Sequence, residues 1–316
     1  MGYKPSSTVF LGDIILLEDS KREPLSSMQR ASRKGQYPYY GAQGIVDYLS
    51  DYTFEGKRLL VAEDGENLRS RKLPIANSVD GKFRVNNHAH VLCETSKCNI
   101  DYLRFYLNST DISAYITGST QPKLSQASLL GMRLDLPPKE KQDAIASFLA
   151  AIERKINLNT RLNGYLEELL LAQFTALSPN EDWTEGRADS YYEIGIGKTP
   201  PRKEPEWFSD VKADNHVWLS IKDMGEAGTY SLDSSEYLTD AAVNAKNVRR
   251  VPAGSVLLSF KLTIGRVKIA GCNMTTNEAI ACFASDDKRK LAYAYPYLRS
   301  FDYGKLGSTS DRKSVV

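Results

Sequence analysis

The segment KEKQDAIASFLAAIERKINLNTRLNGYLEELLLAQFTAL, from Lys139 to Leu177, contains one glycine and no proline. Its large apolar residues recur at steps of three and four, which places them along one stripe of an α-helix. They are Ile145, Phe148, Leu149, Ile152, Ile156, Leu162, Leu166, Leu169, Leu170 and Phe174. Pro138 suits the first helical turn, and Ser178-Pro179-Asn180 is a stop signal. The sequence therefore predicts one long helix over this segment.

A helix of this length extends about 58 Å at about 1.5 Å per residue, well beyond the diameter of one small domain. Its stripe needs a partner along most of its length, most naturally another helix in an antiparallel coiled coil. The alternative is a core helix of a single domain. Asn159, Asn163 and Gly164 interrupt the middle of the stripe, which disfavours that alternative and suggests selection of register or partner.

Short motifs recur on both sides of this helix. Gly-Ser-Thr occurs at Gly118 and again at Gly307, 189 residues later, which is too long a period for a solenoid or propeller. Other echoes keep the same order along the chain. They pair Leu11-Gly12-Asp13 with Arg187-Ala188-Asp189, Asn87-His88-Ala89 with Asn277-Glu278-Ala279, and Tyr102-Leu103-Arg104 with Tyr297-Leu298-Arg299. Two copies of one domain are the simplest explanation.

The expected fold is α+β, with two repeated α/β domains separated by the long helix. A chain of 316 residues is long enough for two domains of about 100 to 200 residues. We expect the first domain at residues 1–138, the helix at 139–178 and the second domain at 179–316. The second copy ends nine residues after Gly307, so we expect it to stop before a second long helix.

The composition indicates an ordinary soluble protein. Hydrophobic residues make up 41% and the mean hydropathy is −0.40, with no apolar run of the 18 or so residues that a membrane span needs. The first 20 residues lack the pattern of a signal peptide. We expect a cytoplasmic protein without membrane attachment.

The sequence suggests no metal or cofactor. Cys93, Cys98, Cys272 and Cys282 form no C-x-x-C pair, so buried free thiols are the preferred interpretation. His88 and His90 could offer ligands from one strand face. However, no third ligand stands at a recognisable spacing.

Basic clusters recur although the net charge is only +2. The clusters are Arg30, Arg33 and Lys34; Arg69, Arg71 and Lys72; Lys198, Arg202 and Lys203; Arg249 and Arg250; Lys261, Arg266 and Lys268; and Lys288, Arg289 and Lys290. Any one of them is more often a solvated surface than a phosphate site. Six clusters interleaved with many of the 18 tyrosines make a polyanion a plausible partner.

One family resemblance covers nearly the whole chain. GSTQPKLSQASLLGMRLDLPPKEKQDAIASFLAAIERKI from Gly118 to Ile156, YPYYGAQGIVDY from Tyr37 and IGIGKTPPR from Ile194 resemble the DNA specificity subunit of type I restriction-modification systems. The resemblance implies two target recognition domains alternating with two long helices that pair antiparallel. It departs at Lys141, because the family usually has acidic residues before the glutamine that is Gln142 here.

The resemblance also implies function and partners. It implies a non-catalytic subunit that reads a bipartite sequence in double-stranded DNA, with adenine methyltransferase subunits that carry out DNA methylation and a restriction translocase subunit as partners. The alternative is a truncated or half-type specificity subunit that acts as a homodimer on a symmetric target. A homodimer through the helix is expected when the chain is isolated, and a separate helix-bearing fragment or a methyltransferase subunit is the second choice.

An enzyme is the competing class of function. LPPKE at Leu136 lacks the amide and the aromatic residue of an adenine methyltransferase loop, and GIGK at Gly195 lacks the second half of a P-loop. We therefore expect a non-catalytic DNA reader.

The candidate base-contacting residues are Tyr40, Gln43, Thr199, Arg202 and Lys203, and the candidate phosphate-contacting residues are Lys72, Lys123, Lys198, Lys261, Arg266 and Lys268. Arg71 is a further candidate DNA-binding residue.

Overall fold

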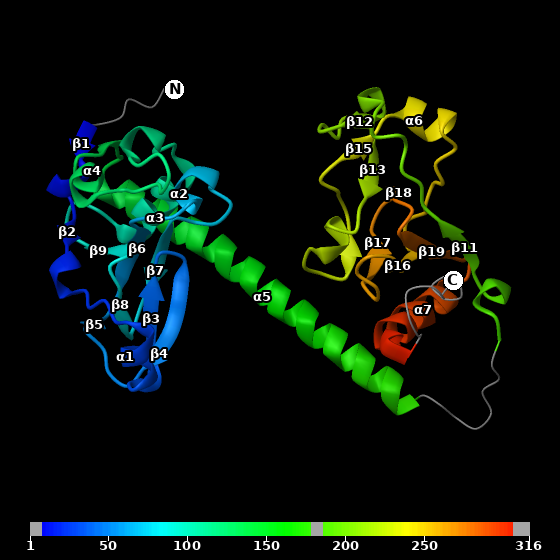
Figure 1. The fold of residues 1–316 in the computed structure, drawn as a ribbon, viewed down its shortest axis with the longest axis horizontal. Helices are drawn as coiled ribbons and strands as arrows, with labels where there is room; N and C mark the ends of the chain where they lie inside the picture. Colours follow the sequence, from blue (N-terminus) through cyan, green and yellow to red (C-terminus); the bar gives the residue numbers. More distant parts are fainter. Residues whose placement is uncertain (1–7, 178–185, 306–316) are drawn as a thin grey trace. The chain divides into compact units, whose positions relative to one another are not determined.

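The computed structural model describes residues 8–177 and 186–305 (Figure 1). The chain divides into two compact units at the boundary between Ile156 and Asn157, here called unit 1 and unit 2. The second Gly-Ser-Thr motif, at Gly307, and the helix stop at Ser178 lie outside the described residues.

Unit 1 contains two four-stranded sheets, one short strand pair and several helices. Its strands are β1 Thr8–Phe10, β2 Leu16–Leu17, β3 Lys34–Gly41, β4 Gly44–Leu49, β5 Phe54–Glu55, β6 Arg58–Ala62, β7 Ala76–Val79, β8 Lys82–Val85, β9 Ala89–Cys93 and β10 Arg133–Asp135. Its helices are η1 Leu11–Asp13, η2 Asp19–Lys21, α1 Ser27–Ala31, α2 Asn67–Ser70, α3 Ile100–Ser109, η3 Ser113–Tyr115 and α4 Gln126–Leu130. The sheet orders are β2, β9, β6, β7 and β4, β3, β8, β5, and β1 pairs with β10.

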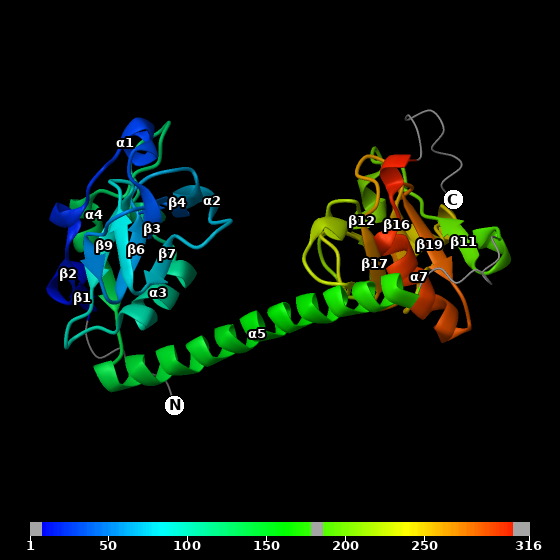
Figure 2. The ribbon, with the colours of Figure 1, turned by 90° about the horizontal axis from the view of Figure 1, so that it is seen from below.

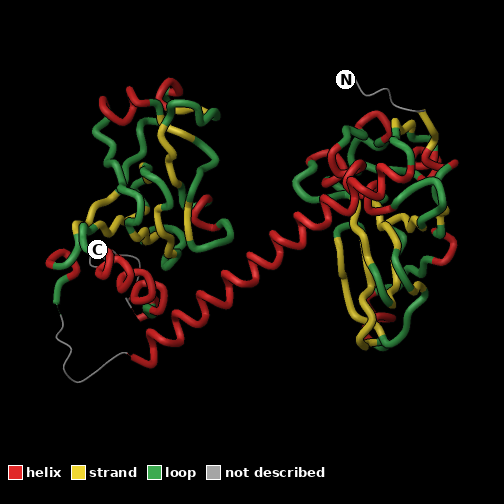
Figure 3. The backbone as a smooth tube through the Cα atoms, turned by 180° about the vertical axis from the view of Figure 1, so that it is seen from behind, coloured by secondary structure: helices red, strands yellow, loops and turns green. Residues whose placement is uncertain are grey.

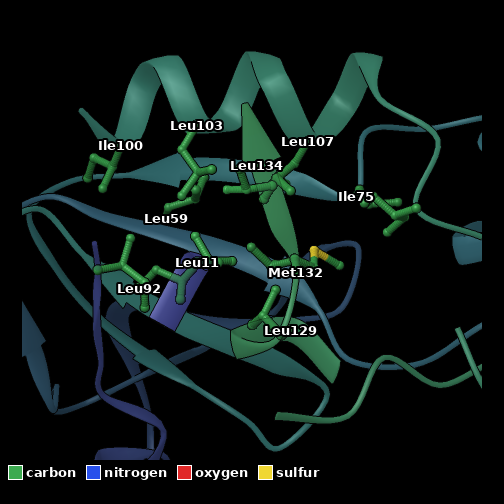
Figure 4. Close-up of a cluster of buried hydrophobic side chains, with 14 of the residues drawn as sticks. Leu11, Leu59, Ile75, Leu92, Ile100, Leu103, Leu107, Leu129, Met132 and Leu134 are labelled. Atoms are coloured by element: carbon green, nitrogen blue, oxygen red, sulfur yellow. The ribbon is translucent and has the colours of Figure 1, made fainter. Parts of the chain in front are cut away.

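Helix α3 closes the main core of unit 1. It begins at Asn99, whose side-chain oxygen accepts hydrogen bonds from the backbone of Asp101 at 2.9 Å and of Tyr102 at 3.0 Å. Leu103 and Leu107, four residues apart, then share one face of the helix. Figure 4 shows this face packed over the sheet, with Leu103 above Leu59 of β6.

Unit 2 also contains two sheets. Its strands are β11 Glu193–Ile196, β12 Phe208–Ser209, β13 His216–Leu219, β14 Tyr230–Ser231, β15 Tyr237–Leu238, β16 Val256–Ser259, β17 Val267–Ala270, β18 Thr275–Thr276 and β19 Ile280–Ala284. Its helices are η4 Ala188–Ser190, η5 Pro205–Trp207, η6 Asp223–Gly225, α6 Asp240–Ala245, α7 Lys288–Ser300 and η7 Tyr303–Lys305. The sheet orders are β11, β19, β16, β17, β14 and β12, β15, β13, β18.

The two units repeat one strand arrangement, and Figure 3 shows the strands of each unit in yellow. The order β2, β9, β6, β7 in unit 1 corresponds to β11, β19, β16, β17 in unit 2. In the second sheets, β4, β3, β8 corresponds to β15, β13, β18, and both β3·β8 and β13·β18 are parallel pairs. The predicted α+β fold with two repeated α/β domains is confirmed.

The register of the paired strands corrects one of the motif matches that the sequence suggested. The backbone N–H of Asn86 donates to Tyr40 at 2.9 Å, and that of Asn277 donates to Leu219 at 3.0 Å, at the same point of the two parallel pairs. Asn277 therefore corresponds to Asn86 and not to Asn87. The sequence match was misleading because unit 1 has two consecutive asparagines, and only the strand pairing decides between them.

Helix α5 spans Lys139–Leu177, the segment for which the sequence predicts one long helix. Its first turn is tied to α3 through Gln142, which is buried. The Gln142 side chain accepts a hydrogen bond from the backbone of Asn99 at 3.0 Å and donates one to the carbonyl of Pro137 at 2.9 Å. This double contact explains why a glutamine stands four residues after Pro138.

Each unit holds its own part of α5 through an arginine. In unit 1, Arg104 of α3 forms two hydrogen bonds with Glu153, at 2.8 and 2.6 Å. In unit 2, Arg299 of α7 bonds Glu167 at 3.0 Å, and Figure 2 shows α7 beside this part of α5. Both arginines come from the repeated Tyr-Leu-Arg motif, so the motif has the same role in both copies.

Candidate nucleic-acid interface

In unit 1, several loops meet at one end of the sheets. The β3–β4 hairpin turn, the turn after β8 and the segment after β6 are neighbours, because Asn86 N–H donates to Tyr40 and Glu63 N–H donates to His88. His88 Nδ1 lies 2.7 Å from Asp64 Oδ2, and Lys123 Nζ lies 3.3 Å from Glu63 Oε1. Exposed polar side chains from distant parts of the sequence therefore gather at this end of unit 1.

The two predicted base readers of unit 1 differ in accessibility. Gln43 is exposed in the hairpin turn, followed by Gly44 with a φ of +122°. Tyr40 is half-buried and packs edge-on against Phe83, with ring centroids 5.7 Å apart. Burial raises the pKa of the Tyr40 phenol. Gln43 is the better candidate for a base contact.

The first Gly-Ser-Thr turn needs its glycine. Gly118 has a φ of +84°, and a Cβ atom there would lie 2.2 Å from the carbonyl oxygen of Gln121. Thr117 and Lys123 close the turn with two backbone hydrogen bonds of 2.8 Å. The Arg69 guanidinium donates to the Ser119 carbonyl at 2.9 Å and also to the Gly118 carbonyl. The turn thus carries Lys123 and a bound arginine to this end of unit 1.

Arg71 does not fit its predicted role as a DNA contact. It has a φ of +50°, and its Nη2 atom donates to the carbonyls of Leu107, Asn108 and Thr110 at 2.7, 3.0 and 3.1 Å. Burial lowers the pKa of Arg71. It caps the carbonyl end of α3 instead, whereas the adjacent Lys72 is exposed.

In unit 2, the loop after β11 brings the predicted residues Lys198, Thr199 and Arg202 together. Lys198 Nζ donates to the Lys246 carbonyl at 2.6 Å, and the Thr199 hydroxyl bonds the Glu278 carboxylate. These bonds fix the loop against the neighbouring turns.

The Arg202 guanidinium is held between an acid and two aromatic rings. It bonds both oxygens of Glu236 at 2.7 Å and lies 4.3 Å from the Phe208 ring centroid and 4.8 Å from that of Trp218. The predicted neighbour Lys203 is exposed. Arg202 is therefore oriented in advance, and Lys203 is left to solvent.

The third predicted group, near β17, separates into exposed and buried residues. Lys261 is exposed, with its Nζ 5.5 Å from the Phe260 ring centroid, and Arg266 donates to the Ile221 carbonyl at 2.6 Å. Lys268 is only 6% exposed, and its ammonium bonds the carbonyls of Glu226, at 2.6 Å, and Gly228. Burial lowers the pKa of Lys268. A phosphate contact by Lys268 does not fit this position, because the side chain is buried and its ammonium bonds two carbonyls inside the fold.

Several residues of these loop clusters were not among the predicted site residues. Asn86 and Asn277 were identified only as repeat landmarks or their neighbours, and Arg69 only as part of a basic cluster. Trp218 gave no separate signal, because it becomes a partner of Arg202 only when β13 and the loop after β11 come together. The asparagines could have been found, since asparagine after a strand is a frequent turn residue.

The predicted helix-pairing residues of α5 lie mostly in solvent. Within the described chain, Gln142 and Ala146 are the buried residues of this helix. Exposed members of the stripe are Ile145, Phe148, Ile152, Ile156, Leu162, Leu166, Leu169 and Leu170. Leu149 is half-buried, and Phe174 packs edge-on against Tyr293 of α7 at 5.3 Å. The stripe of the isolated chain is therefore largely uncovered.

One group of side chains has the donor types of a metal site. Ligand atoms of Asp19, Glu63 and His90 lie within 4.8 Å of one another. Arg22 already lies among them, 2.7 Å from Glu63 and 3.2 Å from Asp19, and His90 Nε2 contacts the Leu124 carbonyl at 2.8 Å. The guanidinium thus supplies the positive charge that a metal would supply. The structure does not bring His88 into this group, because its ring pairs with Asp64.

The comparisons with known proteins agree on one family. The family model described as "Type I restriction modification DNA specificity domain" matches residues 3–168, more than half of the chain. The chain belongs to this family of DNA specificity domains. The predicted class, a recognition subunit of a type I restriction-modification system, is therefore confirmed at the level of the family.

Relatives in the curated proteins carry corresponding names. A putative type I restriction enzyme specificity subunit of Haemophilus influenzae is 35% identical over 143 residues, which is 45% of this chain and 36% of that protein. The EcoprrI specificity subunit of Escherichia coli is 27% identical over 139 residues, or 43% of this chain and 33% of that protein. The matches to these two relatives span only about a third of their length.

A third relative and a solved structure extend over most of the chain. A putative type I specificity subunit of Mycoplasma pneumoniae is 21% identical over 296 residues, covering 90% of this chain and 76% of that protein. The crystal structure of a type I restriction-modification S subunit from M. genitalium gives a TM-score of 0.61 at 12% identity, covering 95% of this chain and 78% of that chain. This likeness establishes the two-unit fold. In the described part of the chain, no helix combines the length and apolar character needed to cross a bilayer.

Proposed function

We propose that this chain reads the sequence of double-stranded DNA for a type I restriction-modification complex and carries out no catalysis itself. The family match over residues 3–168 carries this proposal. The loop clusters of the two units support it, because each presents exposed side chains from several loops at one end of its sheets. Gln43 with Lys123 in unit 1, and Thr199 with Lys203 in unit 2, are exposed or half-exposed at these ends.

The proposed target is bipartite, with one half-site for each unit. B-DNA repeats about every 34 Å, and a helix of 39 residues extends about 58 Å, long enough to hold two readers one DNA turn apart. Selection from a random duplex library should return two specified blocks separated by unspecified base pairs. One continuous block would contradict the bipartite target, and no enrichment at all would contradict DNA reading.

We propose that lysines facing solvent bind the DNA backbone. Lys72, Lys123 and Lys261 are exposed and lie outside the buried core. Charge reversal of each should weaken binding to all sequences and reduce the salt dependence of the affinity. Lys268→Met is the informative comparison, since Lys268 is buried and should affect stability rather than the salt dependence.

Methyl transfer is proposed to need adenine methyltransferase subunits, and cleavage to need a restriction translocase subunit. The uncovered face of α5 is a candidate docking surface for such subunits. Purified alone, the chain should transfer no methyl group from S-adenosylmethionine to DNA. Transfer that persists after removal of every other protein would contradict the non-catalytic role.

In the isolated chain, we propose that a second copy covers the α5 stripe. Burying apolar surface stabilises by about 25 cal/mol per Å², and eight residues of the α5 stripe are exposed. An antiparallel pair about a two-fold axis closes such an interface. A symmetric target read by this homodimer is the second candidate function.

Sedimentation at micromolar concentration tests the dimer. Ile152→Asp or Leu166→Asp should convert a dimer to a monomer, because a carboxylate would be buried at the contact. Arg154→Asp, about 200° around the helix from Ile152, is the matched control and should leave the dimer intact. A monomeric wild-type chain would contradict the homodimer.

A further inference from the structure

One turn is repeated in both units with the same hydrogen bonds. It follows β8 in unit 1 and β18 in unit 2, the strands that pair in parallel with β3 and β13. The turn begins at Asn86 and at Asn277. The backbone N–H of Asn86 bonds the carbonyl of Tyr40, the next-to-last residue of β3, and that of Asn277 bonds the carbonyl of Leu219, the last residue of β13. The two turns therefore occupy the same position in the two copies of the fold.

The asparagine side chains build the turn in the same way. Asn86 Oδ1 accepts from the backbone N–H of His88 at 2.8 Å, and Asn277 Oδ1 accepts from that of Ala279 at 3.1 Å. The third residue of each turn is also fixed. The His88 carbonyl accepts from Glu63 at 2.9 Å and the Ala279 carbonyl accepts from Phe260 at 3.0 Å.

The middle residue of each turn makes none of these hydrogen bonds within the turn; the Asn87 carbonyl lies 3.5 Å from Arg22 Nη1, and the Glu278 carboxylate accepts from Thr199. These residues are Asn87 in unit 1 and Glu278 in unit 2, and both are exposed. The two copies thus hold the main chain alike and present different chemistry at one equivalent position. That pattern is what two readers of different half-sites require, because base contacts specify the sequence whereas shared contacts only position the protein.

The surroundings of both turns are the loops that carry the candidate DNA-binding residues. In unit 2, a Cβ atom on Gly197 would lie 2.2 Å from the Thr276 carbonyl oxygen, so the loop with Lys198 and Thr199 lies directly against the turn. In unit 1, a Cβ atom on Gly41 would lie 3.2 Å from Asn86 Nδ2, next to the hairpin turn that carries Gln43.

We infer that Asn87 and Glu278 are specificity-determining residues, each contacting a base edge in the major groove of its own half-site; this inference rests on the proposed DNA-reading function. An asparagine amide both donates and accepts, and matches the N6 and N7 atoms of adenine. A carboxylate only accepts, and matches the N4 amino group of cytosine. Asn87 is assigned to an adenine and Glu278 to a cytosine.

The charge of Glu278 strengthens the assignment. A carboxylate on a surface that faces phosphates is repelled by them unless it meets a hydrogen-bond donor, and the donors of the major groove are base amino groups. The Thr199 hydroxyl bonds Glu278 and holds its carboxylate in one orientation. Thr199 therefore acts as a positioning residue for Glu278, which differs from the direct base contact expected from the sequence.

Target selection with the full chain tests the inference. Wild type, Glu278→Gln and Asn87→Asp are each selected against a random duplex library, and binding to the wild-type motif is then measured. Glu278→Gln should change the preferred base at one position in one block, and Asn87→Asp at one position in the other. Each variant should lose about tenfold or more in affinity for the original motif.

Matched controls lie beyond the far ends of β9 and β19, the strands that begin just after the two turns. Asp286→Asn removes an exposed carboxylate beyond the far end of β19, and Ser96→Asp adds one beyond the far end of β9. Both should select the wild-type motif. Thr199→Val should weaken the discrimination at the Glu278 position only, and unchanged thermal unfolding of all variants checks the fold.

Each outcome has one meaning. If the wild-type chain enriches no motif, the proposed function fails before the inference is tested. If the wild type enriches a motif and a variant selects the same motif with unchanged affinity, the assignment of that residue is wrong. An equal loss of binding to every sequence would also overturn it, because that result indicates a backbone contact.

Discussion

The two units share a strand arrangement but differ in what lies beside it. In unit 1, His90 of β9 is buried, with its Nδ1 atom 2.6 Å from Asp19, and Arg22 bridges Asp19 and Glu63. These residues form a charged cluster inside the loop end of the unit, which we call the unit 1 ion cluster.

In unit 2, the corresponding positions are apolar. Ala281 pairs with Leu258 in the ladder position where His90 pairs with Val61, and Ile196 lies opposite Ala281. Phe260 follows its strand at the position of Glu63, with its N–H bonded to the equivalent carbonyl. The same backbone is thus compatible with a buried ion cluster in unit 1 and with apolar residues in unit 2, where Ala281 and Phe260 are buried and Ile196 is exposed. The ladder of main-chain hydrogen bonds, and not the identity of the buried residues, defines the repeat.

Removing the cation of the unit 1 ion cluster should have the largest effect. Arg22→Ala leaves Asp19 and Glu63 without their guanidinium partner, and breaking a buried ion pair in this way costs about 3 to 5 kcal/mol. In urea, unit 1 of the variant should unfold at a lower denaturant concentration than in the wild type, and the unfolding midpoint of unit 2 should not change. An unaltered stability of unit 1 would mean that the cluster is not needed. Arg250→Ala, which removes an exposed ion pair with Asp240, is the control and should cost less than about 1 kcal/mol.

The chain offers a separate readout for each unit. Trp207 and Trp218, the tryptophans of the described residues, belong to unit 2, so their fluorescence follows that unit. Cys98 is buried in unit 1, and burial raises the pKa of its thiol to about 12. Labelling of Cys98 at pH 8 therefore follows the opening of unit 1.

Truncation of the equivalent helix leucines should distinguish the two cores. Leu103 of α3 is fully buried, whereas Leu298 of α7 is 9% exposed at the edge of its core. We expect Leu103→Ala to lower the free energy of unfolding of unit 1 by about 3 to 4 kcal/mol, and Leu298→Ala to lower that of unit 2 by about 2 kcal/mol. Equal losses of the free energy of unfolding would show that the two leucines contribute equally to the cores of their units.

Acid should affect the ion cluster through Glu63. Burial acts to raise the pKa of Glu63, but Arg22, His90 and Lys123 outweigh burial and hold the pKa below its ordinary value of 4.5. A lowered pKa in the folded state means stability that is present above pH 4.5 and is lost as the pH falls further. Glu63→Gln should destabilise unit 1 by about 2 kcal/mol at neutral pH.

The pH profile supplies the control for this substitution. The difference between Glu63→Gln and wild type should shrink as the pH falls below 4.5, because the wild-type carboxyl then becomes protonated as well. A difference that stays constant with pH would indicate a packing role for Glu63. Unit 2 has Phe260 at this position and should show no such change.

The arginines that hold α5 should have the smallest effects. Arg104→Ala and Arg299→Ala each remove a partly exposed ion pair, so we expect losses below about 1 kcal/mol. The Arg104 pair is bidentate and should be the stronger of the two. Double-mutant cycles with Glu153→Ala and Glu167→Ala measure each coupling, and a larger coupling for Arg299 would reverse the order.

The sequence was sufficient for features that depend on local pattern. Helix α5 was predictable because 39 residues without proline repeat one apolar spacing, and the two copies were predictable from motifs kept in order. Packing was not predictable in the same way. Whether Lys268 faces solvent depends on loop carbonyls about 40 residues away, and the unit 1 ion cluster joins Arg22 to Glu63 across 41 residues.

The candidate site was only partly predictable for a related reason. Basic clusters in the sequence do not show which side chains make their hydrogen bonds inside the fold. Arg71, for example, bonds carbonyls at the end of α3. The asparagine of a turn such as the one at Asn277 indicates a turn in the sequence but not its counterpart in the other unit, because the other hydrogen bonds of the turn involve the main chain. Strand pairing was needed to recognise Asn86 as its counterpart.

The asparagine turn also has a consequence for how such a protein diversifies. Its shape depends on main-chain groups and on one asparagine, so most side chains at the exposed middle position should change the free energy of folding by less than about 0.5 kcal/mol. Mutation at Asn87 is therefore nearly neutral for the fold, and mutation at Glu278 costs in addition only the bond to Thr199. Single substitutions can therefore arise there during evolution, in either unit independently, without compensating changes elsewhere in the chain.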